Sequence, residues 1–188
     1  MYEFIILALL MRSSMHGYLI AKIASDQIGP WAKISSGTLY TILSKLERSG
    51  LIALVERAEP PQGGRQSRTY EITGAGRLRF HQLMLDTSSN LGEYQRLFYY
   101  KLVYYDLIRP EERLLLWNHY ITYCQTTMLY LQTEAEALRY ELGGDADSVY
   151  LGQALRVMTR LERQWQAEVE WATEERARDV GASATDAL

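Results

Sequence analysis

The clearest alternation of apolar and polar positions in the first half of the chain lies between residues 35 and 50. Apolar side chains recur three and four positions apart, the spacing of one face of an α-helix, at Leu39, Ile42, Leu43 and Leu46. The positions between them carry hydroxyl, lysine and arginine side chains and little acid. Serines at the front can cap free backbone N–H groups, and Gly50 can take the left-handed conformation that ends a helix. The pattern predicts a short helix with an apolar back and a neutral-to-basic front.

Two more helices are predicted before this one. Residues 2–11 are almost entirely apolar, which predicts a helix buried on most sides. This segment is shorter than the roughly 20 apolar residues that a membrane span needs, and no basic residues precede it as they do in a secretion signal. The second helix is expected from about residue 15 to residue 27, because Pro30 disfavours helix in the residue before it. Its inward positions are expected to be Leu19, Ile20, Ile23 and Ala24.

Two short strands are predicted next, over residues 51–57 and 68–73. In the second strand Tyr70 and Ile72 face one way, which is the period-two alternation of a half-buried strand. A loop rich in proline and glycine joins the two strands as a projecting hairpin. Three helices followed by a hairpin form the order of a winged helix-turn-helix. In that architecture the third helix enters the major groove of DNA, and the hairpin reaches the backbone or minor groove.

The second half of the chain predicts longer helices. A fourth helix is expected over residues 74–88, and an aromatic-rich segment, residues 97–105, leads to Pro110, which suits the first turn of a new helix. From there apolar residues are spaced alternately three and four apart over four heptads, at Leu114, Trp117, Ile121, Cys124, Met128, Leu131, Ala135, Leu138 and Leu142. A last helix is expected from about residue 148, with one face formed by Leu151, Ala154, Met158, Leu161, Trp165, Val169 and Ala172. The two predict an antiparallel hairpin whose apolar seam closes within the chain, across a dimer, or both.

The expected fold is therefore mostly α-helical with a small β-hairpin. We expect a winged helix-turn-helix DNA-binding domain over residues 1–88, a helical, coiled-coil dimerisation domain over residues 89–180, and a flexible tail over residues 181–188. One winged helix binds too little DNA for high specificity. We therefore expect a homodimer on a palindromic double-stranded DNA operator, with half-sites about one helical turn, roughly 34 Å, apart.

Charge is distributed unevenly between the two halves. The chain carries a net charge of −3, but residues 1–80 carry +4 and residues 81–188 carry −7. This asymmetry indicates that only the first half meets a polyanion such as DNA. The single cysteine, Cys124, cannot form an internal disulfide, which fits a reducing cytoplasm. No segment is long and apolar enough to span a bilayer, so we expect a cytoplasmic protein with no membrane partner.

Several motifs, in order and at matching spacing over roughly residues 5–80, resemble the PadR family of transcriptional regulators. They are Met15-His16-Gly17-Tyr18, Gly37-Thr38-Leu39-Tyr40, Gly50-Leu51-Ile52, Gly64-Arg65 and Tyr70-Glu71-Ile72-Thr73-Gly74. The chain departs from the pattern at Ile42, where many members have proline. The resemblance implies a dimeric, usually repressing, DNA-binding protein. The long helical tail is similar to that of the subfamily with a larger C-terminal dimerisation domain.

The resemblance also implies which residues contact DNA, since in the family the third helix and the wing do so. In this chain the candidates are Ser36, Thr38, Tyr40, Thr41, Lys45, Arg65, Gln66 and Arg68. Hydroxyl groups, lysine and arginine can meet phosphates and base edges, and arginine on a projecting loop suits a narrow minor groove. The alternative is an ordinary solvated surface and, for Tyr40, a structural role in the core.

A small aromatic effector, such as a phenolic acid, is the expected regulator. Trp117, Tyr120 and Tyr123 are candidates to line its pocket, because aromatic walls suit a flat aromatic molecule. The alternative is that these rings simply belong to the core. The PadR family includes regulators that respond to phenolic acids and others that respond to drugs. A multidrug-responsive regulator is therefore an alternative function.

Two other classes of protein compete with a DNA-binding regulator. A helical adaptor that binds only protein would explain the seam but leave the arginine-bearing hairpin without a role. An enzyme is not expected, because Cys124 lies on the seam as a small core residue. The three histidines, His16, His81 and His119, show no metal-ligand spacing. Accordingly we expect no catalytic residues, no metal site and no cofactor.

Overall fold

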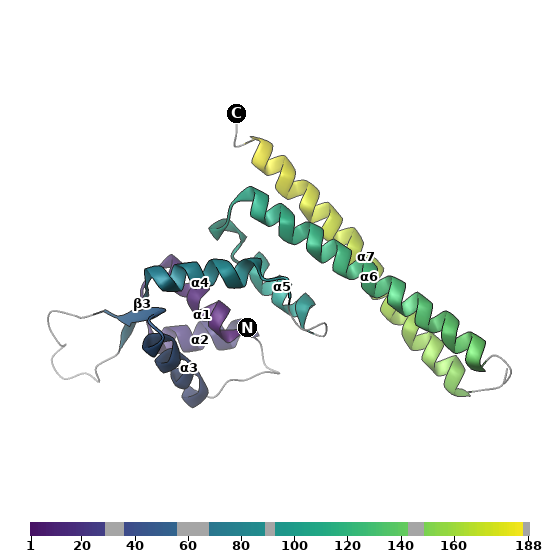
Figure 1. Ribbon diagram of the computed structural model, residues 1–188, viewed down its shortest axis with the longest axis horizontal. Helices are drawn as coiled ribbons and strands as arrows, with labels where there is room; N and C mark the ends of the chain where they lie inside the picture. Colours follow the sequence, from purple (N-terminus) through teal and green to yellow (C-terminus); the bar gives the residue numbers. More distant parts are fainter. Residues whose placement is uncertain (29–35, 56–67, 89–92, 143–148, 186–188) are drawn as a thin grey trace. The chain divides into compact units, whose positions relative to one another are not determined.

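The computed structural model describes residues 1–28, 36–55, 68–88, 93–142 and 149–185 of the 188-residue chain (Figure 1). The chain divides into two compact units, Met1–Leu107 and Ile108–Leu188. Both consist mainly of helices, and the first also holds a small antiparallel sheet. The prediction of a mostly helical protein with a small β element is confirmed. Within the described residues, no helix combines the length and apolar character that crossing a bilayer requires.

The first unit opens with three helices, α1 (Tyr2–Arg12), α2 (Gly17–Ile28) and α3 (Ser36–Arg48). Seven consecutive residues of α1, Phe4 to Leu10, are at most 5% exposed, so the prediction that this helix is buried on most sides is confirmed. In α3 the apolar face points inward as expected, with Leu39, Leu43 and Leu46 buried. Gly50, with φ of 70°, ends this stretch in the left-handed conformation that glycine tolerates best.

The second helix differs from its prediction at its start and along one edge. Met15 and His16, expected in the helix, form a short strand instead, and α2 begins at Gly17. Ile20 and Ala24 are fully buried, but Leu19, expected inward, is 41% exposed. A helix advances about 100° per residue, so Leu19 lies to one side of the stripe that Ile20 and Ala24 share.

The sheet has three strands rather than the two that the sequence predicts, β1 (Met15–His16), β2 (Ile52–Leu54) and β3 (Thr69–Ile72), in the order β1-β3-β2. All neighbours are antiparallel, with Met15 opposite Tyr70 and Ile52 opposite Ile72. The first strand supplies partners for backbone groups of β3 that would otherwise lie on an open edge. The partners of β1 lie more than 50 positions away along the chain. The local pattern of apolar residues therefore cannot predict this strand.

The fourth helix, α4 (Gly74–Leu85), is fastened to the base of the hairpin. Thr73 caps it by accepting a hydrogen bond from the Gly76 N–H at 3.0 Å, and its hydroxyl donates to the Gly50 carbonyl at 2.7 Å. A side chain at Gly76 would be impossible without movement, because its Cβ would lie 2.0 Å from the Leu51 carbonyl oxygen. The helix ends at Leu85 rather than at the expected residue 88, because Asp86 has an extended backbone conformation.

The first unit continues further along the chain than the expected boundary at residue 88. It includes α5 (Tyr94–Leu102) and the short 3-10 helix η2 (Tyr105–Leu107). The ring of Phe4 in α1 stacks on Phe80 of α4 at 5.7 Å and meets the ring of Tyr104 edge-on at 5.8 Å. The residues after α4 thus contribute rings to the same core, and the first compact unit runs to Leu107.

One buried charge distinguishes α5. Lys101 is fully buried, and its Nζ donates a hydrogen bond to the Asp86 carbonyl oxygen at 2.5 Å. Burial penalises the ammonium and lowers the pKa of Lys101 to about 8, although Asp86 acts in the opposite direction.

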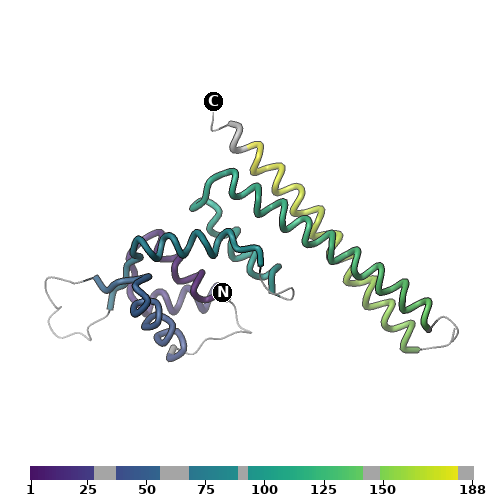
Figure 2. The backbone as a smooth tube through the Cα atoms, in the orientation of Figure 1, coloured from purple at the N-terminus to yellow at the C-terminus, as the bar shows by residue number. Residues whose placement is uncertain are grey.

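The second unit is a pair of long helices, α6 (Pro110–Leu142) and α7 (Val149–Thr185), which lie side by side (Figures 1 and 2). Hydrogen bonds join Trp117 to Asp179, Tyr120 to Glu168 and Gln132 to Glu162, an order that makes the helices antiparallel. The helix α6 begins at Pro110 as expected. Within α7 the helix continues to Thr185, beyond residue 181, where the sequence predicts a tail.

The apolar seam of the hairpin closes only in part within this chain. Trp117, Ile121, Cys124 and Ala135 are each at most 8% exposed. In contrast, Leu114 is 38% exposed and Leu161 of α7 is 37% exposed. Each helix of the pair buries one row of apolar side chains against the other, and side chains at the edges of that row stay exposed to solvent.

Candidate nucleic-acid interface

The surface of α3 carries the side chains that the sequence assigns to DNA. Thr38, Thr41 and Lys45 are exposed, on the side opposite the buried leucines. The Thr41 hydroxyl donates to the Gly37 carbonyl at 2.9 Å. Arg48, in the last turn, donates from Nε to the Ser44 carbonyl at 3.2 Å. The face therefore combines hydroxyl groups with two cations.

Tyr40 lies where α2, α3 and β3 meet. A Cβ built on Gly17 would lie 3.2 Å from Tyr40 Cε1 and 3.2 Å from Tyr70 Cε2. A side chain at position 17 would therefore push against both rings, which would have to move by a few tenths of an ångström. Tyr40 is nevertheless 44% exposed. Its ring thus packs on the fold along one edge and faces solvent along the other, which suits both of the roles that the sequence leaves open.

The candidate DNA contacts on the β-hairpin are only partly described. Arg65 and Gln66 lie outside the described residues, and Ser36 is the first residue of α3, with a side chain that is also outside the described part. Arg68 is exposed and directly precedes β3. Its carbonyl accepts a hydrogen bond from the Gly17 N–H at 3.0 Å, which brings the base of the hairpin to the start of α2.

The three candidate effector residues, Trp117, Tyr120 and Tyr123, lie between α6 and α7. Trp117 Nε1 donates to Asp179 Oδ2 at 3.3 Å, and the Tyr120 hydroxyl donates to Glu168 Oε2 at 2.8 Å. Their rings meet the ring of Trp171 at 5.7 and 6.5 Å, and Tyr123 meets Trp165 at 5.6 Å. The three residues are thus brought together as a column of aromatic rings that pack on α7.

Two cavities are described in the helical hairpin of α6 and α7. The rings of Trp117, Tyr120 and Tyr123 line neither of them. One, of about 170 Å³, is lined by Pro110, Glu111, Leu114, Asp179 and Val180. The other, of about 310 Å³, lies further along the hairpin, against Gln132 and Glu162. Within the described residues, no group of three or more histidine, cysteine or acidic side chains is placed to hold a metal ion. Burial raises the pKa of the Cys124 thiol to about 12, so it is a neutral core group at neutral pH.

Residues 6–82 match the family model described as the transcriptional regulator PadR-like family. The chain carries a PadR-like domain. This domain includes α2, α3, the sheet and most of α4, and therefore every described candidate DNA contact. The family consists of transcriptional regulators rather than enzymes. Among curated proteins, no relative matches the chain.

Several solved structures are similar to this chain over almost their whole length. Bacillus subtilis PadR in complex with operator DNA is 20% identical, with 94% of this chain and 98% of that chain covered, at a TM-score of 0.42. The same protein in complex with p-coumaric acid is 19% identical, with 94% of each chain covered, at a TM-score of 0.37. The Vibrio cholerae virulence activator AphA is 21% identical, with 97% and 99% covered, at a TM-score of 0.38. Because all three TM-scores are below 0.5, the PadR-like domain is identified by the match of residues 6–82 to the family model.

The PadR-like domain also exposes residues to which the sequence assigned no contact. Tyr18, directly after Gly17, is 72% exposed, and Lys22 is exposed one turn later on α2. In helix-turn-helix proteins the helix before the recognition helix crosses the DNA backbone. The available signal was the position of Tyr18 in the motif that opens this helix. The contacts that fix the start of α2, from Gly17 to Tyr40 and Arg68, are tertiary and have no local sequence signal.

Proposed function

We propose that this PadR-like protein is a dimeric, sequence-specific DNA-binding repressor of transcription. The observation that carries the proposal is the exposed face of α3. Among the described side chains of this helix, the exposed ones are hydroxyl-bearing or cationic, and none is acidic. A regulator of this kind acts where the DNA is, so we place it in the cytoplasm.

The size of α3 supports binding in the major groove. Its 13 residues give a length of about 20 Å, and the major groove, about 12 Å wide, admits an α-helix. Lysine and arginine release counterions from the phosphates they neutralise, so they supply affinity. Hydroxyl groups at Thr38 and Thr41 suit base edges, which supply specificity. The +4 charge of residues 1–80 steers this half toward DNA.

The open flanks of the hairpin support a homodimer. Leu129, Tyr130, Tyr150 and Val157 are between 59% and 66% exposed on α6 and α7. Exposed apolar side chains on a pair of long helices are typical of an association surface. A second copy covers this surface, and the resulting symmetric pair presents two copies of α3 to a palindrome. Sedimentation at micromolar concentration tests this, and a monomer would contradict the proposal.

Selection of binding sites from random duplexes tests DNA recognition directly. We expect a palindrome, and its half-site spacing would define the operator. Lys45→Ala and Arg65→Ala should each weaken binding about tenfold and reduce the slope of log K against log salt by about 1, without lowering the melting temperature. Arg156→Ala, an exposed cation on α7, is the matched control. If no duplex binds at low salt, the proposal is wrong and the helical adaptor is the alternative to test next.

A small aromatic effector stays a separate prediction. A ligand that favours a dimer with the wrong wing spacing would release the operator in proportion to its differential affinity for the two states. Phenolic acids and drug-like molecules are the two panels to test. Tryptophan fluorescence and operator affinity should both change with the true effector, and Trp117→Phe should reduce the fluorescence change. No response to either panel would remove the effector from the proposal.

A further inference from the structure

A cavity of about 310 Å³ lies between α6 and α7, toward the end of the helical hairpin where α6 finishes and α7 begins. Among the described residues, those that line it all belong to the second unit. Part of the lining is apolar, with Leu131 and Ala135 from α6 and Met158 from α7. Ligand-binding clefts in proteins have volumes from about 300 Å³ upward. The cavity is therefore large enough for a small molecule, and its apolar side chains suit an aliphatic stem.

Three charged side chains also line this cavity. On α6, Glu136 and Arg139 are three positions apart, and residues with this spacing are neighbours on one side of a helix. Glu162 lines the cavity from α7, where its Oε1 accepts a hydrogen bond from Gln132 Nε2 at 2.5 Å. That bond joins the two helices beside the cavity. It engages one of the two carboxylate oxygens, and the other can accept a hydrogen bond from a ligand.

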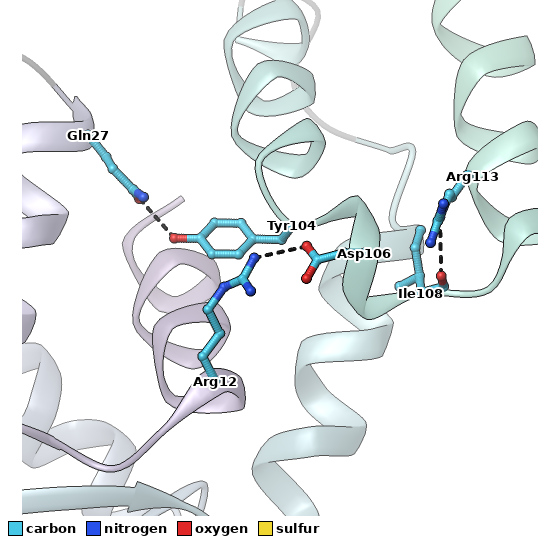
Figure 3. Close-up of polar contacts among 6 residues, drawn as sticks. All are labelled: Arg12, Gln27, Tyr104, Asp106, Ile108 and Arg113. Carbon is cyan, nitrogen blue, oxygen red and sulfur yellow. Dashed lines mark hydrogen bonds and ion pairs between the residues drawn. The ribbon is translucent and has the colours of Figure 1, made fainter. Parts of the chain in front are cut away.

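The charges around the cavity are not used in ion pairs within the chain. In the first unit, by contrast, Arg12 donates to Asp106 at 2.9 Å (Figure 3). None of the ion pairs among the described residues includes Glu136, Arg139 or Glu162. Two carboxylates and one guanidinium therefore line a cavity rather than pair with each other, and they are available to a ligand of complementary charge.

We propose that this cavity binds a basic amino acid, such as free lysine. A basic amino acid carries two cations and one carboxylate, which complement the two carboxylates and the guanidinium of the cavity. Its α-ammonium and α-carboxylate are attached to one carbon, so they suit the neighbouring Glu136 and Arg139 on α6. Arginine binds a carboxylate through two parallel N–H bonds, which fixes the orientation of the ligand. The cation of the ligand's side chain then binds Glu162 on α7.

The separation of the helices selects the length of the ligand. The axes of packed helices lie about 8–10 Å apart, a gap that an aliphatic stem can bridge between Glu136 and Glu162. A short zwitterion such as glycine would engage Glu136 and Arg139 and leave Glu162 without a partner. A simple diamine would engage both glutamates and leave Arg139 without one. A basic amino acid satisfies all three charges, with its stem against Leu131 and Met158.

Most of the surface proposed for the homodimer points away from the cavity. With 3.6 residues per turn, Tyr130 of α6 lies more than 90° around the helix from Glu136 and Arg139. On α7, Val157 lies more than 90° from Glu162 for the same reason. A second copy that covers Tyr130 and Val157 leaves the cavity open. Ligand binding can therefore be measured on the full chain, and the inference goes beyond DNA binding without depending on it.

The methyl group of Met158 offers a reporter inside the cavity. In the full chain labelled with ¹³C-methyl methionine, Met158→Leu assigns this signal among those of the six methionines. We expect lysine to shift the Met158 signal saturably, with a Kd of about 1 mM or tighter, because several charge-assisted hydrogen bonds contribute. Norleucine lacks the side-chain ammonium and cadaverine lacks the carboxylate. Each should bind at least tenfold more weakly than lysine.

Matched substitutions connect each group of the ligand to one residue. Glu162→Gln should weaken lysine at least tenfold and leave norleucine unchanged, because it removes only the partner of the side-chain ammonium. Arg139→Gln should weaken lysine at least tenfold and leave cadaverine unchanged. Glu134→Gln and Arg160→Gln alter exposed charges outside the lining of the cavity, and they should leave all three ligands unchanged. A general loss of structure would instead weaken every ligand alike.

The possible failures of the proposal can be recognised one by one. No shift of the Met158 signal up to about 10 mM lysine would overturn it and leave an ordinary solvated surface. Equal affinity for lysine and either analogue would also overturn it, as would lysine binding that Glu162→Gln and Arg139→Gln do not weaken. The titrations contain no DNA, so a negative result leaves the proposed function in place. A protein that binds no duplex can equally still bind lysine.

Discussion

The two units of this protein bury their apolar side chains in different ways. In the first unit several helices and a sheet surround α1, and seven consecutive residues of that helix lie inside. In the second unit α6 and α7 pack on each other, and seam residues such as Leu114 and Leu161 stay more than one-third exposed. The first fold is complete within one chain, whereas a two-helix layer needs a further surface to cover its flanks.

The largest expected effect tests this difference in burial directly. Leu7→Ala, in the middle of α1, should lower the free energy of unfolding by about 3 kcal/mol, because the site is fully buried and leaves a cavity. Leu161→Ala should cost less than about 1 kcal/mol in dilute, dissociated protein, since the side chain is already 37% exposed. Urea unfolding followed by circular dichroism measures both. Equal losses would remove the contrast between the units.

Alkaline pH should stabilise the first unit through Lys101. Its pKa is about 8 in the folded protein and near 10.5 in the unfolded chain. Between these values the unfolded chain binds the extra proton, so the free energy of unfolding rises with pH, by about 2 kcal/mol from pH 8 to pH 9.5. Urea titrations across this range measure the slope, and Lys101→Met should abolish it. A slope that survives in this variant would assign the effect to other groups.

Raising the pH should destabilise the helical hairpin of α6 and α7, which is the opposite of its effect on the first unit. The pKa of Cys124 is raised from 9.0 to about 12 by burial, so above pH 9 the unfolded chain loses a proton that the folded chain keeps. The hairpin should therefore lose about 1 kcal/mol for each pH unit above 9. Tryptophan fluorescence during unfolding follows mainly this unit, which holds three of the four tryptophans, with Cys124→Ala as the control. A hairpin that is equally stable at pH 9 and pH 10 would contradict the assignment.

The smallest expected effect concerns Asp179, which joins the end of α7 to the start of α6. Asp179 accepts a hydrogen bond from Trp117 and pairs with Arg113 at 3.4 Å, with both charged side chains 24% exposed. Asp179→Asn should lower the free energy of unfolding by about 1 kcal/mol. Glu174→Gln, which alters a pair whose side chains are each 68% exposed, should have almost no effect. Similar losses in both variants would show that the partial burial of Asp179 has no energetic consequence.

The elements that the sequence predicts well are those with local signals. The apolar run of α1, the helical spacing in α3, the left-handed Gly50 and the start of α6 at Pro110 can all be read within a window of a few residues. The family resemblance over roughly residues 5–80 is confirmed by the match at residues 6–82. The exposed face of α3 follows from the same helical spacing.

The elements that the sequence misses depend on distant partners. The strand β1 exists because β3 offers it backbone groups, with His16 opposite Thr69. The residues of α5 and η2 join the first unit because Tyr104 reaches Phe4 and Gln27. The close approach of Gly17 to Tyr40 and Tyr70 also depends on tertiary contacts. No local periodicity encodes such contacts.

The close approach at Gly76 has a consequence for genetics. Because even a methyl group there would collide with the Leu51 carbonyl, every missense change at this codon displaces α4 from the base of the hairpin. A screen for loss-of-function alleles should therefore recover substitutions at position 76 as readily as substitutions on the exposed face of α3. Such alleles would fail because α4 is displaced, with every candidate DNA-contact residue unchanged.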